Sequence, residues 1–497
     1  MPSSSSPGRS RPRRRLMVVA AALALTLSGC VATGTSRDSA GTTRAGEQIA
    51  ADNLGAVRSI LRTYAIVDEE FAPHVTAHLF GVPGLASLSS AVEAEVLAAI
   101  EAAGSFGDRA AYSPVLTDPS LRRAPAEFIA TGPGPGTTGT DPRLAEATGA
   151  PTETPAEATG SPTGGPGAEA GLEIANEVLA AGGDFLVSRL RVAGVDDPAG
   201  TVSVFVTDLA ADTTVDAQDL LGATVDPAAI GVDAAGTLTV DGSPVGRERL
   251  SAQGDAVVRA LRTPVALPAD ADERSPDYSC SLLPCVALTY DDGPGEADVE
   301  NALLDAAAEA KVRVTYFLLG KNAAAFPGTV ERMVASGHEI ANHTHTHPQL
   351  DRTSASTVTT QVRQADDAIE SAGAGRPQLM RPPYGALDAS AARALGHPAI
   401  LWDVDTEDWR HRNAEKVVDS VARETGPGSV VLMHSIHPST VEAAPEVFAA
   451  VADKGLYAVT VSELFAGVEF TDGARYYCRG YADELCSNPE HPAVLGS

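Results

Sequence analysis

The chain has 497 residues, of which 44% are hydrophobic, so its length allows two or three domains with sizeable cores. It carries 36 basic and 65 acidic residues, which give a formal net charge of −29 at pH 7. Nucleic acid and anionic membrane surfaces repel an acidic protein, so this charge argues against both as main partners.

The first thirty residues have the pattern of an export signal rather than of a folded element. A basic stretch precedes an apolar run over 16–27, which is too short to span a bilayer. The sequence Leu27-Ser28-Gly29-Cys30 then resembles a bacterial lipobox, in which Cys30 is lipidated and becomes the first mature residue. An ordinary signal peptide containing a cysteine, and twin-arginine export, both remain open. In each case we expect the mature chain outside the cytoplasm, lipid-anchored to the cell membrane or associated with the cell wall.

Two low-complexity segments separate the export signal and the ordered parts. Residues 31–46 are rich in Thr, Ser and Gly and are predicted to form a flexible tether. Residues 47–130 show helical periodicity over 54–61 and 92–100. Of the forty residues 131–170, twenty-six are Pro, Gly, Ser or Thr, so this segment cannot bury a core and is predicted to be disordered.

Residues 171–265 regain an ordered pattern. Strand-like runs occur over 185–187, 202–206 and 237–240, and apolar spacing predicts a closing helix around 257–261. Together with 47–130 they are predicted to form one small α+β accessory domain, interrupted by the low-complexity loop. No catalytic constellation occurs in it, so we interpret it as a spacer or wall-positioning module.

From residue 280 to 467 strand-like and helix-like runs alternate. Strands are predicted over 286–290, 312–319, 399–404 and 429–433, and helices over 299–310, 414–424 and 440–453. Repeated βα units give a parallel sheet or a barrel, in which catalytic residues gather where strands end. The polar residues that closely follow such runs are Asp291, Asp292, Asp405, Asp408 and His434.

Four cysteines besides Cys30 flank this region in two local pairs, the second within the C-terminal extension 468–497. Export favours disulfides, and short loops favour the pairings Cys280–Cys285 and Cys478–Cys486. A bridge between the two ends of the domain remains open. A four-cysteine zinc site is disfavoured, because the spacings are not C-x-x-C.

Asp291 and Asp292 place two like charges at the end of an apolar run, which is costly unless a cation neutralises one of them. His343 and His347 follow later in the chain. One Asp and two His would make a three-ligand metal site with an open position, which is a catalytic arrangement rather than a structural one. The other carboxylate would be free as a general base. A solvated turn for the Asp pair and a structural role for the His pair are the alternatives, and His345 is not expected to be a ligand.

A stiff segment supplies the next candidate. Arg381 is followed by two prolines and Tyr384, and the prolines limit the freedom of the backbone. An arginine held in this way could orient a carboxylate through two hydrogen bonds. The alternative for this segment is a surface proline turn.

Two later strand ends supply an acid and an apolar surface. His434 ends a strand-like run, and an imidazole there could serve as general acid because its pKa lies near working pH. Asp408 could keep it protonated and oriented. Trp409 offers an apolar plane on which sugars stack, with core packing as its alternative. His437 is a second candidate for the acid.

The sequence thus contains five motifs: the Asp pair, the His pair, the Arg381 segment, Asp408 with Trp409, and the strand that ends at His434. In this order and spacing they resemble the polysaccharide deacetylase family, the NodB homology domain of carbohydrate esterases, over residues 284–467. The segment 432–438 is similar to the peptidoglycan N-acetylglucosamine deacetylases in particular. The resemblance implies a distorted (β/α) barrel. Two residues depart from the family pattern: Tyr290 replaces the usual Phe, and Ser435 replaces the Asp that often follows the last histidine.

The resemblance also implies a role for each matched residue. Asp291 would be the general base and Arg381 would hold it in place. Tyr384 would lend its backbone N–H to the oxyanion, and Asp408 would tune His434, the general acid. A divalent metal, Zn or Co, would be bound by Asp292, His343 and His347. The acetyl group would be bound by Trp409, Leu432 and Pro383.

This resemblance predicts a metal-dependent enzyme that hydrolyses N-acetyl groups of cell-wall polysaccharide, with peptidoglycan N-acetylglucosamine as the favoured substrate and acetate as a product. Chitin oligomers and O-acetyl xylan are alternative substrates of the same kind of site. A lipid-anchored glycan-binding or sensor protein with a vestigial site is the alternative from another class. The sequence does not predict an oligomeric state, and it indicates the lipid anchor as the only contact with the membrane.

Overall fold

The computed structural model describes residues 38–71, 73–104, 112–130, 171–194, 197–268 and 274–480. The predicted export signal with Cys30, the low-complexity segment 131–170 and the predicted bridge partner Cys486 lie outside these residues. Among the described helices, none is long and apolar enough to cross a membrane. Contacts between Cα atoms group the chain from Arg44 onward into one unit.

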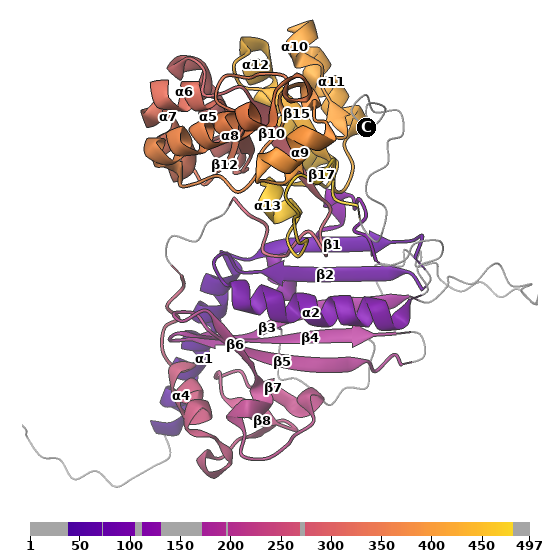
Figure 1. The fold of residues 1–497 in the computed structure, drawn as a ribbon. Coiled ribbons are helices and arrows are strands. Elements are labelled where there is room, and N and C mark those ends of the chain that lie inside the picture. The colour runs from indigo at the N-terminus through magenta and orange to yellow at the C-terminus, as the bar shows by residue number, and fades with distance from the viewer. Residues whose placement is uncertain are drawn as a thin grey trace, which may run out of the picture. The chain divides into compact units, whose positions relative to one another are not determined.

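One six-stranded sheet organises the residues up to 216, and its strands lie in chain order (Figure 1). Neighbouring strands are antiparallel except for the parallel pair β2 and β3. The predicted runs 185–187 and 202–206 are confirmed as parts of β4 and β5. The strands are β1 (Arg62–Asp68), β2 (Val75–Gly81), β3 (Leu172–Gly182), β4 (Phe185–Ala193), β5 (Thr201–Asp208) and β6 (Thr213–Asp216).

Helix α2 (Ala86–Ala103) lies along this sheet (Figure 1). Leu88, Val92, Val96 and Ile100 are all buried. Their spacing of four residues places them on one helical face, which confirms the helix predicted over 92–100. The helix is held by packing of this apolar face against the sheet, and its first turn is capped by Asp212, whose carboxylate accepts hydrogen bonds from the N–H groups of Ala86 and Ser87.

Helix α1 (Asp38–Arg58) differs from the prediction at both ends. It begins inside the range 31–46, so the prediction of a flexible tether is wrong for 38–46. Within 38–46, Ala40, Arg44 and Ala45 are good helix formers. At the other end the helix stops at Arg58, before the predicted limit of 61.

A smaller antiparallel sheet follows, made of β7 (Ile230–Val232), β8 (Leu238–Val240) and β9 (Ser243–Pro244). Strand β8 confirms the run predicted over 237–240. Helix α4 (Ala252–Ala260) is capped by Ser251, whose hydroxyl accepts a hydrogen bond from the N–H of Gly254. The helix predicted around 257–261 is therefore present, although it begins earlier.

The residues from 285 onward form a mixed α/β structure around a parallel sheet. The strand order is β12-β11-β10-β15-β14, and β16 also pairs with β10. Every pair in this sheet is parallel. The strands are β10 (Cys285–Asp291), β11 (Thr315–Leu318), β12 (Glu339–Asn342), β14 (Val404–Asp405), β15 (Val430–His434) and β16 (Tyr457–Val459).

Helices alternate with these strands, as the sequence predicts. Apolar side chains of α5, α7, α11 and α12 pack with those of β10, β11 and β15 in one core. The strands are apolar on both faces, which is typical of a parallel sheet covered by helices. The helices are α5 (Ala297–Ala310), α6 (Gly320–Ala325), α7 (Pro327–Ala335), α8 (Ala355–Ile369), α9 (Ala389–Leu395), α10 (Asp408–His411), α11 (Ala414–Glu424), α12 (Pro438–Asp453) and α13 (Val461–Leu464).

The strand predicted over 399–404 is wrong as one continuous element. It is divided into β13 (Ala399–Ile400) and β14, and β13 pairs with β17 (Arg475–Tyr476) of the C-terminal extension. The guanidinium of Arg381 donates hydrogen bonds to the carbonyl oxygens of Ile400 and Leu401, at 3.1 and 3.0 Å. These two carbonyl groups therefore bind a side chain at the point where the strand is interrupted.

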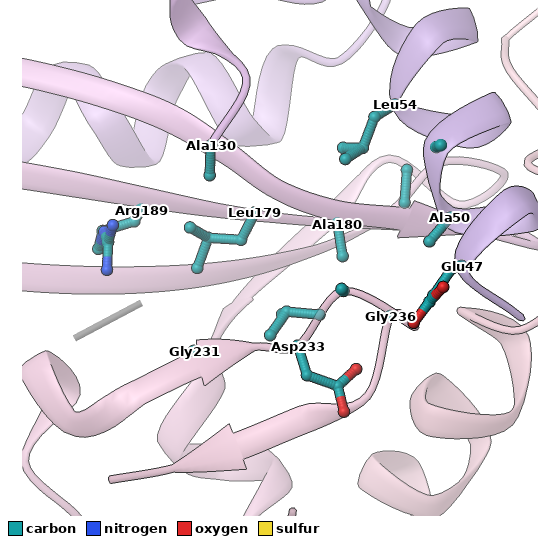
Figure 2. Close-up of a pocket in the computed structure, with 14 residues that line it drawn as sticks. Glu47, Ala50, Leu54, Ala130, Leu179, Ala180, Arg189, Gly231, Asp233 and Gly236 are labelled. Atoms are coloured by element: carbon teal, nitrogen blue, oxygen red, sulfur yellow. The ribbon is translucent and has the colours of Figure 1, made fainter. Parts of the chain in front are cut away.

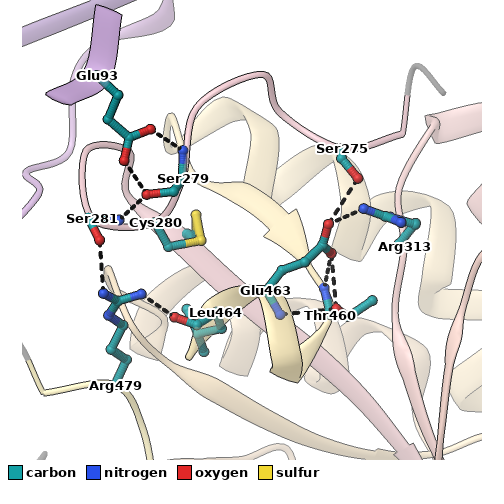
Figure 3. The surroundings of a disulfide bond; sticks show 11 residues. Glu93, Ser275, Ser279, Cys280, Ser281, Arg313, Thr460, Glu463, Leu464 and Arg479 are labelled. Atoms are coloured by element: carbon teal, nitrogen blue, oxygen red, sulfur yellow. Dashed lines mark hydrogen bonds and ion pairs between the residues drawn. A yellow bond between two sulfur atoms is a disulfide. The ribbon is translucent and has the colours of Figure 1, made fainter. Parts of the chain in front are cut away.

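A disulfide joins Cys280 to Cys285 at the start of β10. Figure 3 shows the surrounding hydrogen bonds: the carboxylate of Glu93 accepts from the N–H of Ser279 at 2.7 Å, and Arg479 donates to the hydroxyl of Ser281 at 3.1 Å. The short loop of the disulfide is thus bound by α2 on one side and by the C-terminal extension on the other. Cys478 is also disulfide-bonded.

We expect the double variant Cys280→Ser/Cys285→Ser to lose about 2 kcal/mol of unfolding free energy, because opening a short loop restores chain entropy to the unfolded state. Urea unfolding of the oxidised protein and the double variant measures this difference. A reductant also opens the disulfide of Cys478, so treatment of the intact protein should lower its unfolding free energy by at least as much. Unchanged unfolding midpoints in both experiments would contradict it.

Candidate metal centre and active site

The ends of neighbouring parallel strands bring the candidate residues together. Asp291 and His434 are the last residues of β10 and β15, and they are direct partners in the register of the two strands. The N–H of His343 donates to the carbonyl oxygen of Leu318 at the end of β11. The carboxyl ends of three adjacent strands therefore meet at one site.

Arg381 is fully buried and holds the side chain of Asp291 in place. Its Nη1 donates to Asp291 Oδ1 at 2.8 Å and to Thr289 Oγ1 at 2.7 Å. Its guanidinium lies 4.1 Å from the ring centre of Phe317, which adds a cation–π contact. Burial raises the pKa of Asp291, and the positive charge of Arg381 opposes this. The pair leaves Asp291 Oδ2 directed toward the histidines, 3.6 Å from His343 Nε2.

Asp292, His343 and His347 place one ligand atom each within 4.8 Å of one another. Asp292 Oδ1 lies 3.7 Å from His343 Nε2 and 3.5 Å from His347 Nε2. These separations are too long for direct hydrogen bonds, and they suit three atoms that surround one ion. His345 is not part of this group.

Unusual backbone conformations occur at two of the three ligands and at the residue that follows the third, His343. Asp292, Thr344 and His347 all have positive φ angles, of 70°, 68° and 65°. Non-glycine residues adopt this region rarely, so surrounding contacts must hold it. In the histidine loop, Asn342 Oδ1 accepts a hydrogen bond from the N–H of Thr344 at 2.6 Å, and Thr344 Oγ1 accepts one from the N–H of His347 at 3.1 Å.

The residues present fit a divalent metal. Asp292 Oδ1 is buried and has no hydrogen-bond partner among the described residues. Burying this oxygen costs free energy unless it binds a cation. The Nδ1 of His343 lies 2.7 Å from the carbonyl oxygen of Arg381 and donates its proton there, which leaves Nε2 unprotonated toward the other ligands. Burial lowers the pKa of His343 to about 3, so the ring is neutral at working pH. One carboxylate and two neutral imidazoles are a donor set for zinc or a similar ion.

Adding Zn²⁺ at a hundred times its dissociation constant should raise the unfolding free energy of the metal-free protein by about 2.7 kcal/mol, because the ion binds the folded state alone. A thermal-unfolding titration measures this effect. His343→Ala should abolish the shift, whereas His397→Ala, which changes a histidine outside the group, should leave it unchanged. A full shift in His343→Ala would show that the ion binds elsewhere.

His434 and Asp408 form the second polar pair of the site. His434 Nδ1 lies 2.8 Å from Asp408 Oδ1, and its backbone N–H donates to Asp408 Oδ2 at 2.7 Å. Asp408 is fully buried and also accepts a hydrogen bond from Thr440 Oγ1 at 2.7 Å. Burial disfavours the protonated imidazole, but the hydrogen bond and the charge of Asp408 outweigh it and raise the pKa of His434. A group that holds its proton in this way suits a general acid.

The remaining predicted residues lie around these two pairs. Tyr384 has a positive φ of 63° in the short turn Pro383–Gly385, and its ring lies 4.6 Å from that of His347. Leu432 and Pro383 are buried, whereas Trp409 is 47% exposed. Trp409 therefore has a free face, so core packing does not account for it. His437 lies with its ring 5.5 Å from that of His434, and burial lowers its pKa, which suits a general acid less well.

Three supporting residues were missed by the sequence analysis. Thr289 fixes Arg381, Thr440 fixes Asp408, and Asn342 fixes the histidine loop. Asn342 also donates to the buried carboxylate of Asp366 at 2.7 Å. Asn342 stands next to His343, so its position was a usable signal, whereas nothing in the sequence connects Thr440 with Asp408.

A separate cavity lies among α1, β3, β4 and the segment that joins β7 to β8 (Figure 2). Its charged side chains are Glu47, Arg189 and Asp233, and the rest of its lining is Ala, Gly, Leu and Val. Arg189 is already paired with the carboxylate of Glu177. None of the candidate site residues lines this cavity, and it offers no arrangement of acid, base or ligand.

Comparison with known proteins relates the chain to a family. The model of the polysaccharide deacetylase domain matches residues 281–400. A peptidoglycan-N-acetylmuramic acid deacetylase, PdaC, of Bacillus subtilis is 38% identical over 179 residues, which are 36% of this chain and 38% of that protein. A peptidoglycan-N-acetylglucosamine deacetylase, PgdA, of Listeria monocytogenes is 36% identical over 192 residues, 39% of this chain and 41% of that protein.

A third relative is matched over most of its length. It is a chitooligosaccharide deacetylase of a Bradyrhizobium species, 40% identical over 158 residues, which are 31% of this chain and 71% of that protein. The chain thus spans about two fifths of the length of the two peptidoglycan deacetylases, but more than two thirds of this shorter relative. The residues matched by the family model include Asp291, Asp292, His343, His347 and Arg381.

Proposed function

The chain belongs to the polysaccharide deacetylase family, and from this premise we propose that it hydrolyses N-acetyl groups of cell-wall polysaccharide and releases acetate. We further propose peptidoglycan N-acetylglucosamine as its substrate. Two of the relatives described above are peptidoglycan deacetylases, although one is named for N-acetylmuramic acid. The observation that carries the proposal is the meeting of Asp292, His343 and His347 beside an unligated, arginine-held Asp291 and a proton-bearing His434.

In this proposal Asp292, His343 and His347 hold a divalent ion, Zn or Co. The ion, when bound, would polarise the acetyl carbonyl and a water molecule. Asp291 accepts the proton of that water as it attacks the carbonyl carbon, and Arg381 keeps the carboxylate in position for the transfer. Burial raises the pKa of Asp291, and the charge of Arg381 opposes this rise, which favours the ionised form that a base requires.

The remaining residues act on the developing charge and on the leaving group. The backbone N–H of Tyr384 donates to the oxygen of the tetrahedral intermediate, a contact typically worth about 3 kcal/mol. His434 transfers its proton to the departing sugar amine, so the C–N bond breaks and an amine forms. Asp408 stabilises the imidazolium before that transfer. Leu432 and Pro383 enclose the acetyl methyl group, and Trp409 stacks on the sugar.

The wider organisation is also part of the proposal. We propose that the parallel sheet closes as a distorted (β/α) barrel, and that 47–130 with 171–265 is an accessory domain that positions the enzyme. The single-residue bridges of Met380 to Asn342 and to Ala399 support closure, since they continue the pairing beyond β12. The cell-wall substrates of the relatives support a place outside the cytoplasm, reached through the predicted signal and lipid on Cys30.

Acetate release from a panel of glycans tests the function. Metal-free protein is loaded with Zn²⁺ or Co²⁺ and incubated with peptidoglycan, chitin oligomers and O-acetyl xylan. We expect release from peptidoglycan, at a rate above that from the other two. Release from xylan alone would make the chain an esterase, and release from none of them would overturn the proposal in favour of a binding protein.

A further inference from the structure

Glu300 is a buried carboxylate that has no part in the proposed chemistry, and it contacts the turn that follows the metal ligand Asp292. Glu300 of α5 has no exposed surface. Its Oε1 accepts hydrogen bonds from the hydroxyl of Ser435 at 2.6 Å and from the N–H of Gly295 at 2.8 Å. Its Oε2 is buried and has no hydrogen-bond partner among the described residues. Burying a carboxylate oxygen without a partner costs free energy, so this position calls for a reason beyond packing.

Glu300 connects the two loops that carry opposite sides of the site. Gly295 belongs to the turn that begins at Asp292, and Ser435 directly follows His434. One carboxylate oxygen binds a group from each loop. The helix that carries Glu300 therefore fixes the separation between a metal ligand and the general acid.

The backbone that follows the metal ligand Asp292 packs closely against the hydrogen-bonded pair of Glu300 and Ser435. A Cβ atom added at Gly293 would lie 2.8 Å from Ser435 Oγ and 2.9 Å from Glu300 Oε1. Real Cβ atoms do not approach other atoms so closely, so the backbone next to Asp292 has no space in which to shift toward the pair. A change at either side chain is therefore transmitted to the residue that follows the ligand.

The charge of Glu300 acts on two buried tyrosines, Tyr290 and Tyr316. Their rings stack with centres 5.7 Å apart, and neither hydroxyl has a hydrogen-bond partner among the described residues. Burial raises the pKa of both, and the negative charge of Glu300 raises it further, so both hydroxyl groups keep their protons.

We propose that Glu300 is a positioning residue, which holds Asp292 and His434 at their working separation through Gly295 and Ser435. Position 435 is where the family resemblance leads one to expect Asp. In this chain the hydroxyl comes from the loop and the carboxylate comes from helix α5. The inference rests on the proposed function for its rate measurements, whereas metal binding tests it separately.

The first experiment compares Glu300→Ala with Glu300→Gln. The Ala variant loses both contacts, so we expect its kcat to fall about tenfold to a hundredfold and the affinity of the metal-free protein for Zn²⁺ to fall about tenfold. The Gln variant keeps an acceptor oxygen, and both quantities should stay within about threefold of the wild-type values. Competition with a chromophoric chelator measures the Zn²⁺ affinity without any turnover.

A matched control separates positioning from loss of stability. Leu304 lies one helical turn further along α5, and its apolar side chain is buried in the core. Leu304→Ala should lower the melting temperature but leave kcat and Zn²⁺ affinity unchanged. If it lowers all three as much as Glu300→Ala does, the positioning role is wrong and Glu300 acts through stability alone.

Exchange of the two partners provides a rescue. Ser435→Asp places a second carboxylate against Glu300, so we expect it to lower kcat and Zn²⁺ affinity. The double variant Glu300→Ser/Ser435→Asp restores one carboxylate and one hydroxyl, and should recover at least half of the lost Zn²⁺ affinity. Wild-type affinity in Ser435→Asp, or in a folded Glu300→Ala, would overturn the inference. Wild-type protein that binds Zn²⁺ but releases no acetate would instead overturn the proposed function.

Discussion

Replacing Asp291 with Asn is expected to lower acetate release by about 10²- to 10⁴-fold, the usual contribution of a general base. The Asn side chain keeps an oxygen for Arg381 but cannot take a proton from water. Metal binding should persist, because Asp291 is outside the ligand group of Asp292, His343 and His347. Initial rates of acetate release, measured at saturating Zn²⁺ for both proteins, give the comparison.

A matched carboxylate variant controls for the loss of a buried charge. Asp403 accepts hydrogen bonds from Ser429 and from the N–H of Val430, and burial raises its pKa to about 6. Asp403 has no role in the proposed chemistry, so Asp403→Asn should leave the rate near that of the wild-type protein. Removing Asp291 also leaves the buried Arg381 without its counter-charge, which costs about 3 kcal/mol of stability. Full activity in a folded, Zn²⁺-bound Asp291→Asn would remove Asp291 from the mechanism.

Replacing His434 with Asn should lower kcat by a similar factor of about 10² to 10⁴, because the leaving amine then has no proton donor. His437→Asn is the control, since this second histidine lies close by but is not placed in the chemistry. Its rate should stay near the wild-type value. If His437→Asn loses more activity than His434→Asn, the assignment of the acid is reversed.

The pH profile gives a second measurement of the same pair. His434 acts in its protonated form, so activity should fall as pH rises through its pKa. Burial opposes protonation, but Asp408 outweighs it and raises this pKa, which extends activity to higher pH. In Asp408→Asn the raising effect is lost, so the fall should move to lower pH. A profile that does not move would show that another group carries the proton.

The sequence predicted the strand-end residues well, because apolar runs mark where each strand stops. Asp291 and His434 end β10 and β15 as that rule predicts, and the register of the two strands brings them side by side. Asp408 was predicted by the same rule but is the first residue of α10. The rule works because the carboxyl ends of parallel strands meet at one edge. It needs no knowledge of how the intervening helices pack.

Contacts across long stretches of sequence were not predictable in this way. The proline-rich segment suggested a stiff Arg381, but not that its guanidinium would bind Ile400 and Leu401 and accompany the interruption of a strand. Glu300 stands in an amphipathic helix among polar residues, where a carboxylate normally faces solvent. Only the fold shows that it turns inward toward Ser435. Tertiary contacts that join distant segments leave no local pattern to read.

Mass spectrometry of muropeptides shows which sugar the protein deacetylates. Purified peptidoglycan is incubated with Zn²⁺-loaded protein, digested, and compared with the same material treated with Asp291→Asn. We expect loss of one acetyl group from N-acetylglucosamine residues in the wild-type digest alone, with acetate in equal amount. Muropeptides that keep every acetyl group, or that lose it only from N-acetylmuramic acid, would contradict this expectation.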